Sequence, residues 1–190
     1  MTMVKLLDEG FAWTRQRVAV VKPAHLNRGT PCAEWNLRQL LEHMLTTMDL
    51  MSNAAMNADV AEDGNALIAA GDFLKGDDPL SAFDAVVERA LSIWHVPDRL
   101  EGTCIMPFGP APRLMAAQIS LNDAVVHAWD IGRTTGEDAD IPAGVADELL
   151  KIDRRLIASL GGRGGLFGEE IDIRTSSASD RLVAYLGRTP

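Results

Sequence analysis

The chain has 190 residues, of which 47% are hydrophobic, and a formal net charge of -9. This apolar content argues against disorder, and the length suits one domain with a sizeable core and a small extension. An acidic chain without a basic cluster is a poor candidate for binding nucleic acid or anionic membrane surfaces. We find no signal peptide or apolar run of about 18 residues, and Cys32 and Cys104 form no CxxC pair, so we expect a cytoplasmic protein without disulfides.

Apolar residues at helical spacing predict a first helix over residues 4–22, which ends before the prolines and glycine of "KPAHLNRGTPC". The second helix has a clearer start. Asn36 is a good N-cap, and Gln39 three residues later completes a capping box. One stripe of this helix carries His43 between leucines, so we expect His43 to face inward.

Residues 62–78 are weakly periodic and are expected to form a connection. Asp78 then caps a third helix that has Pro79 at its first position and must end before Pro97. We expect a loop over residues 96–113, because "VPDRLEGTCIMPFGPAPR" carries four prolines and two glycines.

A fourth helix is predicted from about Leu114 to Thr135, with Gly136 as its C-terminal stop, and a fifth from Pro142 to the glycines after residue 160. "GGRGGLFG" lacks the ending of a phosphate loop, so we expect a flexible connection. "EEIDIR" is expected to be a short strand and "SDRLVAYLG" a small last helix. These elements predict a mainly α fold, with a helical bundle over residues 1–160 and a small extension over residues 161–190.

The fourth predicted helix carries three polar side chains on one face. Asp123 and His127 are four residues apart, and Asp130 follows three residues later. Burying a charged acid without a partner is costly, and a metal would remove that cost. With His43 from the second helix, Asp123 and His127 would supply three ligands and leave one position for water or substrate, as catalytic zinc sites require. Such nitrogen and oxygen ligands suit zinc, nickel, iron or manganese.

The same residues have a simpler interpretation. A histidine hydrogen-bonded to an acid four residues away needs no metal, and His43 would then be a satisfied core histidine. Asp130 would either orient a ligand histidine or pair with Arg133 as a purely structural contact. His25 in a loop and His95 at a helix end carry no comparable pattern.

Cys32, in "TPCAEWN", precedes the second helix. A thiol near a helix N-terminus can have a lowered pKa and act as a nucleophile. No histidine or asparagine base signature accompanies Cys32, so burial beside the neighbouring tryptophan is the preferred interpretation. Trp35, Trp94 and Trp129 are expected in the core or in the lining of a pocket.

Two segments resemble a known family. "TPCAEWNLRQLLEHML" resembles the "TPC-x-x-W-x-hydrophobic-x-x-L-x-x-H" signature of mycothiol-dependent maleylpyruvate isomerase-like proteins in the DinB superfamily, and "DAVVHAWDIGRTTG" resembles that family's acid-x-x-x-His segment. The ending "DRLVAYLGRTP" looks like the end of a subgroup of short proteins that are described only as metal-binding. The resemblance spans nearly the whole chain. It implies a DinB-like four-helix bundle that binds zinc or nickel through His43, Asp123 and His127, with Asp130 supporting a ligand.

The resemblance also implies a thiol-dependent transferase or isomerase. The metal would lower the pKa of a bound thiol, and a mycothiol-type thiolate would attack an electrophilic carbon of a small-molecule substrate. Two departures argue against maleylpyruvate isomerisation itself. The isomerase has glutamate where this chain has Asp123, and it carries a sizeable C-terminal domain where only residues 169–190 follow the glycine-rich stretch.

Two other functions stay open. One is a non-catalytic bundle that binds a metal or a protein partner, and the other is a plain helical domain held by hydrogen bonds alone. An apolar helix face would serve a homodimer as well as the core.

Overall fold

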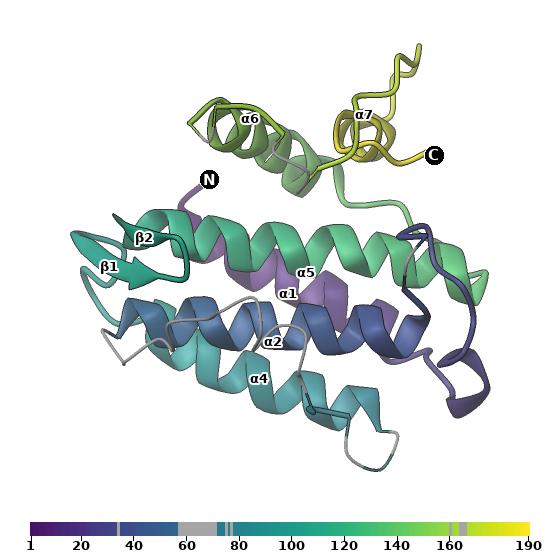
Figure 1. Ribbon diagram of the computed structural model, residues 1–190, viewed down its shortest axis with the longest axis horizontal. Coiled ribbons are helices and arrows are strands. Elements are labelled where there is room, and N and C mark those ends of the chain that lie inside the picture. Colours follow the sequence, from purple (N-terminus) through teal and green to yellow (C-terminus); the bar gives the residue numbers. More distant parts are fainter. Residues whose placement is uncertain (34, 57–71, 75, 77, 160, 164–166) are drawn as a thin grey trace. The chain divides into compact units, whose positions relative to one another are not determined.

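The computed structural model describes residues 1–33, 35–56, 72–74, 76, 78–159, 161–163 and 167–190 (Figure 1). The chain forms two compact units, residues 2–139 and residues 140–190 with Met1. The first unit contains α1 (Met3–Val18), the short 3-10 helix η1 (Pro23–His25), α2 (Leu37–Ala55), α4 (Pro79–Trp94), β1 (Thr103–Met106), β2 (Gly109–Pro112) and α5 (Arg113–Thr135). The second contains α6 (Ala143–Ser159) and α7 (Ala178–Tyr185).

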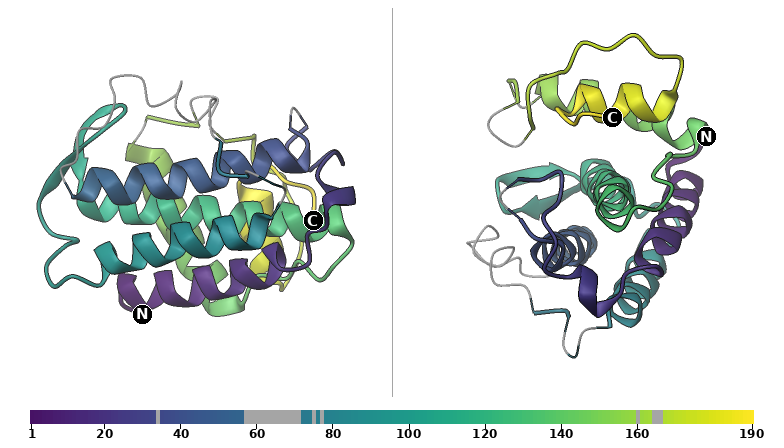
Figure 2. Two further views of the ribbon diagram at one scale, coloured as in Figure 1. Left: turned by 90° about the horizontal axis from the view of Figure 1, so that it is seen from below. Right: turned by 90° about the vertical axis from the view of Figure 1, so that its right-hand side faces the viewer.

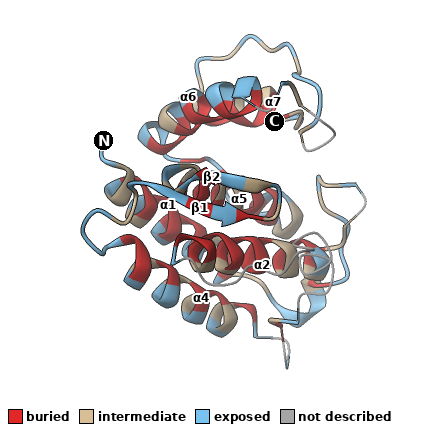
Figure 3. Ribbon diagram, turned by 60° about the vertical axis from the view of Figure 1, so that its left-hand side comes forward, coloured by how far each residue is buried: buried red, intermediate tan, exposed pale blue. Residues whose placement is uncertain are grey.

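The long helices of the first unit form a four-helix bundle. α2 packs on α5 and α4, and α1 packs on the same two helices, so the four make a ring that is visible end-on in Figure 2. Apolar side chains on the inner faces are buried (Figure 3), and Phe11, Met44, Phe83 and Leu121 are each at most 1% exposed. The predicted all-α fold and its four-helix bundle are confirmed.

The two helices that matter most for the site run antiparallel. The segment before α2 lies beside the end of α5, where Arg28 Nη1 donates to the carbonyl of Thr134 at 3.4 Å. Pairs of residues along α2 and α5 therefore meet in reverse order. His43, near the start of α2, consequently faces the middle of α5 rather than its beginning.

Most helix ends lie where the sequence predicts them. The Asn36 side chain accepts from the Gln39 amide at 3.0 Å, and the Gln39 side chain accepts from the Asn36 amide at 3.0 Å, which completes the capping box. Asp78 caps α4 as predicted. Gly136 ends α5 in the left-handed conformation, with φ of 82°, which glycine adopts without steric cost.

The first helix is shorter than predicted. α1 ends at Val18, whereas the sequence predicted helix up to residue 22. Lys22 has φ of -114° and ψ of 156°, and Pro23 follows it. Since the ring of a proline disfavours the helical conformation in the preceding residue, the chain leaves the helix before it reaches Pro23.

The expected loop over residues 96–113 is wrong in its second half, which forms a β-hairpin. β1 and β2 pair antiparallel, with Thr103 opposite Pro112. Side chains alternate along β1, since Cys104 is 2% exposed and Ile105 is 58% exposed. Prolines signalled a loop, but a two-stranded sheet has only edge strands, and edge strands tolerate proline.

In the second unit, α7 confirms the small last helix, and Gly161 and Gly162 follow α6 with positive φ. The strand expected in "EEIDIR" is wrong: described residues 169–174 have no strand partner, and the Ile171 amide instead donates to the carbonyl of Ala184 in α7. α6 packs with α7. The domain boundary expected at residue 160 stays a prediction. The weakly periodic connection lies mostly outside the described residues. Among the described helices, none is long and apolar enough to cross a membrane.

Candidate metal centre

Three of the predicted site residues meet between α2 and α5. His43 lies in the second turn of α2, and Asp123 and His127 lie one turn apart in the middle of α5. Oδ1 of Asp123 is 3.2 Å from Nε2 of His43 and 3.5 Å from Nε2 of His127. Each residue thus directs one potential ligand atom toward the same small volume, and these atoms lie within 4.8 Å of one another.

The two distances allow hydrogen bonding and metal binding to be compared. Hydrogen bonds between a charged imidazole and a carboxylate are typically about 2.7–2.9 Å long. Ligand atoms about 2.0–2.1 Å from one tetrahedral zinc ion lie about 3.3–3.4 Å from each other. The observed 3.2 and 3.5 Å separations bracket the second value, and the shorter of them is also within hydrogen-bond reach.

The site also holds polar atoms that lack a hydrogen-bond partner. The side chains of His43, Asp123 and His127 are 20%, 15% and 8% exposed. Within the described part of the chain, Oδ2 of Asp123 and Nδ1 of His43 are buried and have no hydrogen-bond partner. An unsatisfied buried polar atom costs about 1–3 kcal/mol, and more when it is charged. A divalent cation would offset this cost at Asp123, so the residues fit such an ion.

The charges of the cluster support one another. Burial favours the neutral carboxyl, but the imidazoles of His43 and His127 outweigh burial and hold the pKa of Asp123 well below its usual value. Burial likewise opposes protonation of His127, and the charge of Asp123, with hydrogen bonds to Asp123, Asp130 and Cys32, raises the pKa of His127 well above its usual value. A divalent cation would displace the proton that the cluster holds on Nε2 of His127 and would take its place beside the ionised carboxylate.

Asp130 contacts the far side of the His127 ring. Its carboxylate is fully buried, and Oδ2 accepts from Nδ1 of His127 at 2.9 Å, which is typical of a charge-assisted hydrogen bond. This bond keeps the proton on Nδ1 and leaves Nε2 toward Asp123. Arg133, the other partner considered for Asp130, lies over the ring of Trp129 at 5.4 Å.

Two residues of the segment before α2 also reach the cluster, and the sequence did not place them there. The ring of Trp35 lies 4.4 Å from that of His43 between centroids, at an interplanar angle of 40°. Sγ of Cys32 lies 3.5 Å from Oδ2 of Asp130. Both belong to the "TPC-x-x-W" motif. This motif is therefore the sequence signal that could have placed them at the cluster.

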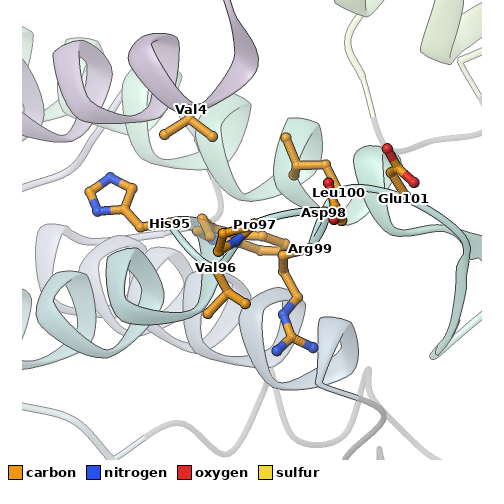
Figure 4. A pocket seen from close by; sticks show the side chains of 9 residues that line it. Val4, His95, Val96, Pro97, Asp98, Arg99, Leu100 and Glu101 are labelled. Carbon is orange, nitrogen blue, oxygen red and sulfur yellow. The ribbon is translucent and has the colours of Figure 1, made fainter.

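The other features weighed in the sequence lie apart from this cluster. His95 ends α4, and its Nε2 is 2.8 Å from Oδ1 of Asp8 in α1. A hollow of about 280 Å³ surrounds this helix end and is lined by Val4 and residues 94–101 (Figure 4). It shares no residue with the cluster around His127.

The four-helix bundle, in which two histidines and an acid meet between antiparallel helices, has a DinB-like fold. Residues 7–132 match the family described as the mycothiol maleylpyruvate isomerase N-terminal domain, and the chain belongs to that family. The chain is also 28% identical over 175 residues to the uncharacterised proteins MT0763 and Rv0738 of Mycobacterium tuberculosis, strains CDC 1551 / Oshkosh and ATCC 25618 / H37Rv. These matches cover 90% of each chain.

Two crystal structures of the mycothiol-dependent maleylpyruvate isomerase have the same fold. A histidine-to-alanine mutant of that enzyme aligns with a TM-score of 0.66 at 17% identity, over 84% of this chain and 71% of the other. The second structure aligns with a TM-score of 0.63 at 19% identity over the same shares.

Proposed function

We propose that this protein binds one divalent metal through His43, Asp123 and His127, and that it uses a low-molecular-weight thiol of the mycothiol type to transfer or isomerise a small electrophile. The observation that carries the proposal is the convergence of two Nε2 atoms on Oδ1 of Asp123 at 3.2 and 3.5 Å. Zinc is the first candidate for the metal, and nickel is the second. Membership of the mycothiol maleylpyruvate isomerase family supports the thiol.

The number of ligands favours a catalytic over a structural role. Structural zinc sites use four protein ligands, whereas catalytic sites use three and leave a position for water or substrate. Among the described residues, the cluster directs three ligand atoms to one place. A metal bound there would lower the pKa of a thiol or water and so supply a nucleophile at neutral pH.

Three residues of the chain favour metal binding at this site through charge, proton placement and packing. Asp123 brings the negative charge that offsets a divalent cation, and its burial strengthens that attraction. Asp130 keeps the proton of His127 on Nδ1, so that the lone pair of Nε2 is free to bind. Trp35 covers one side of the His43 ring and limits its rotation.

The first experiment is elemental analysis of untagged protein purified without chelator. We expect about one zinc or nickel per wild-type chain and none in His127→Ala. The matched control is His95→Ala, which removes a histidine that pairs with Asp8 outside the cluster and should keep the metal. No metal in the wild type after incubation with zinc or nickel would refute the proposal and favour a cluster closed by hydrogen bonds.

The second experiment tests the chemistry. Metal-loaded wild-type protein should either consume mycothiol with a small electrophile such as a chloronitrobenzene, which releases chloride as the thioether forms, or isomerise a small electrophile such as maleylpyruvate only when mycothiol is present, with the thiol regenerated. His127→Ala and chelated protein should not, while His95→Ala should behave as the wild type does. A protein that keeps its metal but neither consumes thiol nor isomerises any electrophile tried would favour the non-catalytic metal-binding function.

A further inference from the structure

Hydrogen bonds tie Thr30, Cys32 and Trp35 to one another ahead of α2. The Thr30 hydroxyl lies 3.1 Å from the carbonyl oxygen of Cys32 and 2.9 Å from that of Trp35, and it donates toward both. The Trp35 amide donates to the same Cys32 carbonyl at 2.8 Å. An isolated β-bridge joins Gly29 to Asn36 at the base of the segment. These bonds hold Cys32 in place without any contribution from its own side chain.

The thiol of Cys32 lies against the carboxylate that contacts His127. Sγ of Cys32 is 3.5 Å from Oδ2 of Asp130, and the same oxygen is 2.9 Å from Nδ1 of His127. Since a carboxylate only accepts, both the thiol and the imidazole donate to it. Asp130 is fully buried, so each of these donors matters to the cost of keeping its charge there.

Cys32, Asp130 and His127 would also be close enough to hold a metal themselves. The geometry argues against this arrangement. The 2.9 Å between Nδ1 of His127 and Oδ2 of Asp130 is the length of a hydrogen bond and is shorter than the separation of about 3.3 Å expected between two zinc ligands. The imidazole would in addition have to bind metals through both of its nitrogen atoms.

We infer that Cys32 is a positioning residue of the metal centre, whose thiol holds Asp130 against Nδ1 of His127 and thereby fixes the ring that presents Nε2 to the metal. This inference rests on the proposed function. Partners of ligand histidines typically change metal affinity 10–100-fold when they are removed. Cys32 contacts both His127 and its partner Asp130 but is not one of the three ligands, so its removal should weaken metal binding about 10-fold and not abolish it.

The test is a Co²⁺ titration of metal-free wild type, Cys32→Ala, Cys32→Ser and Cys104→Ala, with apparent affinity and the visible spectrum as readouts. Cys32→Ala should bind Co²⁺ about 10-fold more weakly, and Cys32→Ser, which keeps a hydrogen-bond donor, should recover part of this loss. Cys104→Ala removes the thiol of the other cysteine, which is buried in β1, and should bind as the wild type does.

Three results would overturn the inference while leaving the proposed function intact. They are wild-type affinity in Cys32→Ala, equal losses in Cys32→Ala and Cys32→Ser, and a sulfur-to-cobalt charge-transfer band in the wild type, which would make Cys32 a ligand. Failure of the wild type to bind Co²⁺ would instead refute the proposed function.

A nitrogen-15 spectrum of the metal-free protein tests the chain of hydrogen bonds independently of metal. The proton on Nδ1 of His127 should change its chemical shift in Cys32→Ala and return toward the wild-type value in Cys32→Ser. An unchanged signal in Cys32→Ala would mean that the thiol does not act on Asp130.

Discussion

At the scale of single residues, the two histidines are held by different means. His127 donates through Nδ1 to Asp130, the arrangement usual for a ligand histidine. Nδ1 of His43 is buried and has no hydrogen-bond partner among the described residues, and the Trp35 ring packs against its imidazole instead. One histidine therefore has a carboxylate beside each ring nitrogen, whereas the other has a carboxylate at Nε2 and the Trp35 ring against its face.

Asp130→Asn should weaken metal binding at least about 10-fold without abolishing it. The amide still accepts from Nδ1 of His127 but no longer carries the charge that increases the basicity of the ring. Isothermal titration of the metal-free protein with zinc measures the effect.

The control for this variant is Asp84→Asn, which makes the same chemical change at a surface residue paired with Arg15 and should leave the affinity unchanged. Wild-type affinity in Asp130→Asn would mean that Asp130 has only a structural role.

At the scale of elements, the close approach of α1 to α5 depends on a glycine. A Cβ atom at Gly10 would lie 2.3 Å from Cδ1 of Leu121 and 3.1 Å from Cγ2 of Val125. Both contacts are on the buried face of α5, one turn from Asp123 or closer. Leu121 would therefore have to adopt another rotamer in a core that is already closely packed.

Gly10→Ala should lower the free energy of unfolding by about 1–2 kcal/mol. Overpacking costs about 1–3 kcal/mol, and the better helix propensity of alanine returns up to about 1 kcal/mol. Urea denaturation followed by circular dichroism measures the change.

Gly144→Ala is the matched control, because the nearest atom to its added Cβ is the end of the Met1 side chain at 3.9 Å. It should be neutral or slightly stabilising. A stabilised Gly10→Ala protein would show that α1 and α5 can separate at no cost.

At the scale of the whole molecule, stability should depend on pH through a residue outside the candidate metal centre. Asp153 in α6 is fully buried, and neither of its carboxylate oxygens has a hydrogen-bond partner among the described residues. Burial raises the pKa of Asp153 to about 8, although the charge of Arg188 opposes this shift. The folded protein thus keeps a proton that the unfolded chain releases near pH 4.

The consequence is a stability that falls as pH rises. Between about pH 4 and pH 8 the folded state binds one proton more than the unfolded state at this residue, so the free energy of unfolding decreases by at most about 1.4 kcal/mol per pH unit. The contribution of Asp153 is complete below pH 4 and is lost once the pH passes 8.

Asp153→Asn, which resembles the protonated acid, should remove this slope and raise stability at pH 8. Urea denaturation at pH 5, 6.5 and 8 measures how the free energy of unfolding changes with pH. Asp147→Asn changes an exposed acid of the same helix, which pairs with Arg181, and should leave the slope as it is. An identical slope in wild type and Asp153→Asn would exclude Asp153 as its source.

Local signals predicted much of this architecture. The capping box of Asn36 and Gln39, the Asp78 cap and the Gly136 stop each depend on a few neighbouring residues, and each was found where expected. Predictions failed where the outcome depended on a distant partner. The hairpin of β1 and β2 requires two short segments to pair, and "EEIDIR" has strand-like residues but no described partner strand.

By itself, the sequence determined which polar residues share a face of α5, because the 3.6-residue period of a helix is a property of the backbone. Only the tertiary structure decided that His43, 80 residues before Asp123, lies against that face, and that Cys32 and Trp35 reach the same cluster. The burial of apolar faces selects which helices are neighbours, and this choice depends on side chains throughout the bundle rather than on the residues of the site.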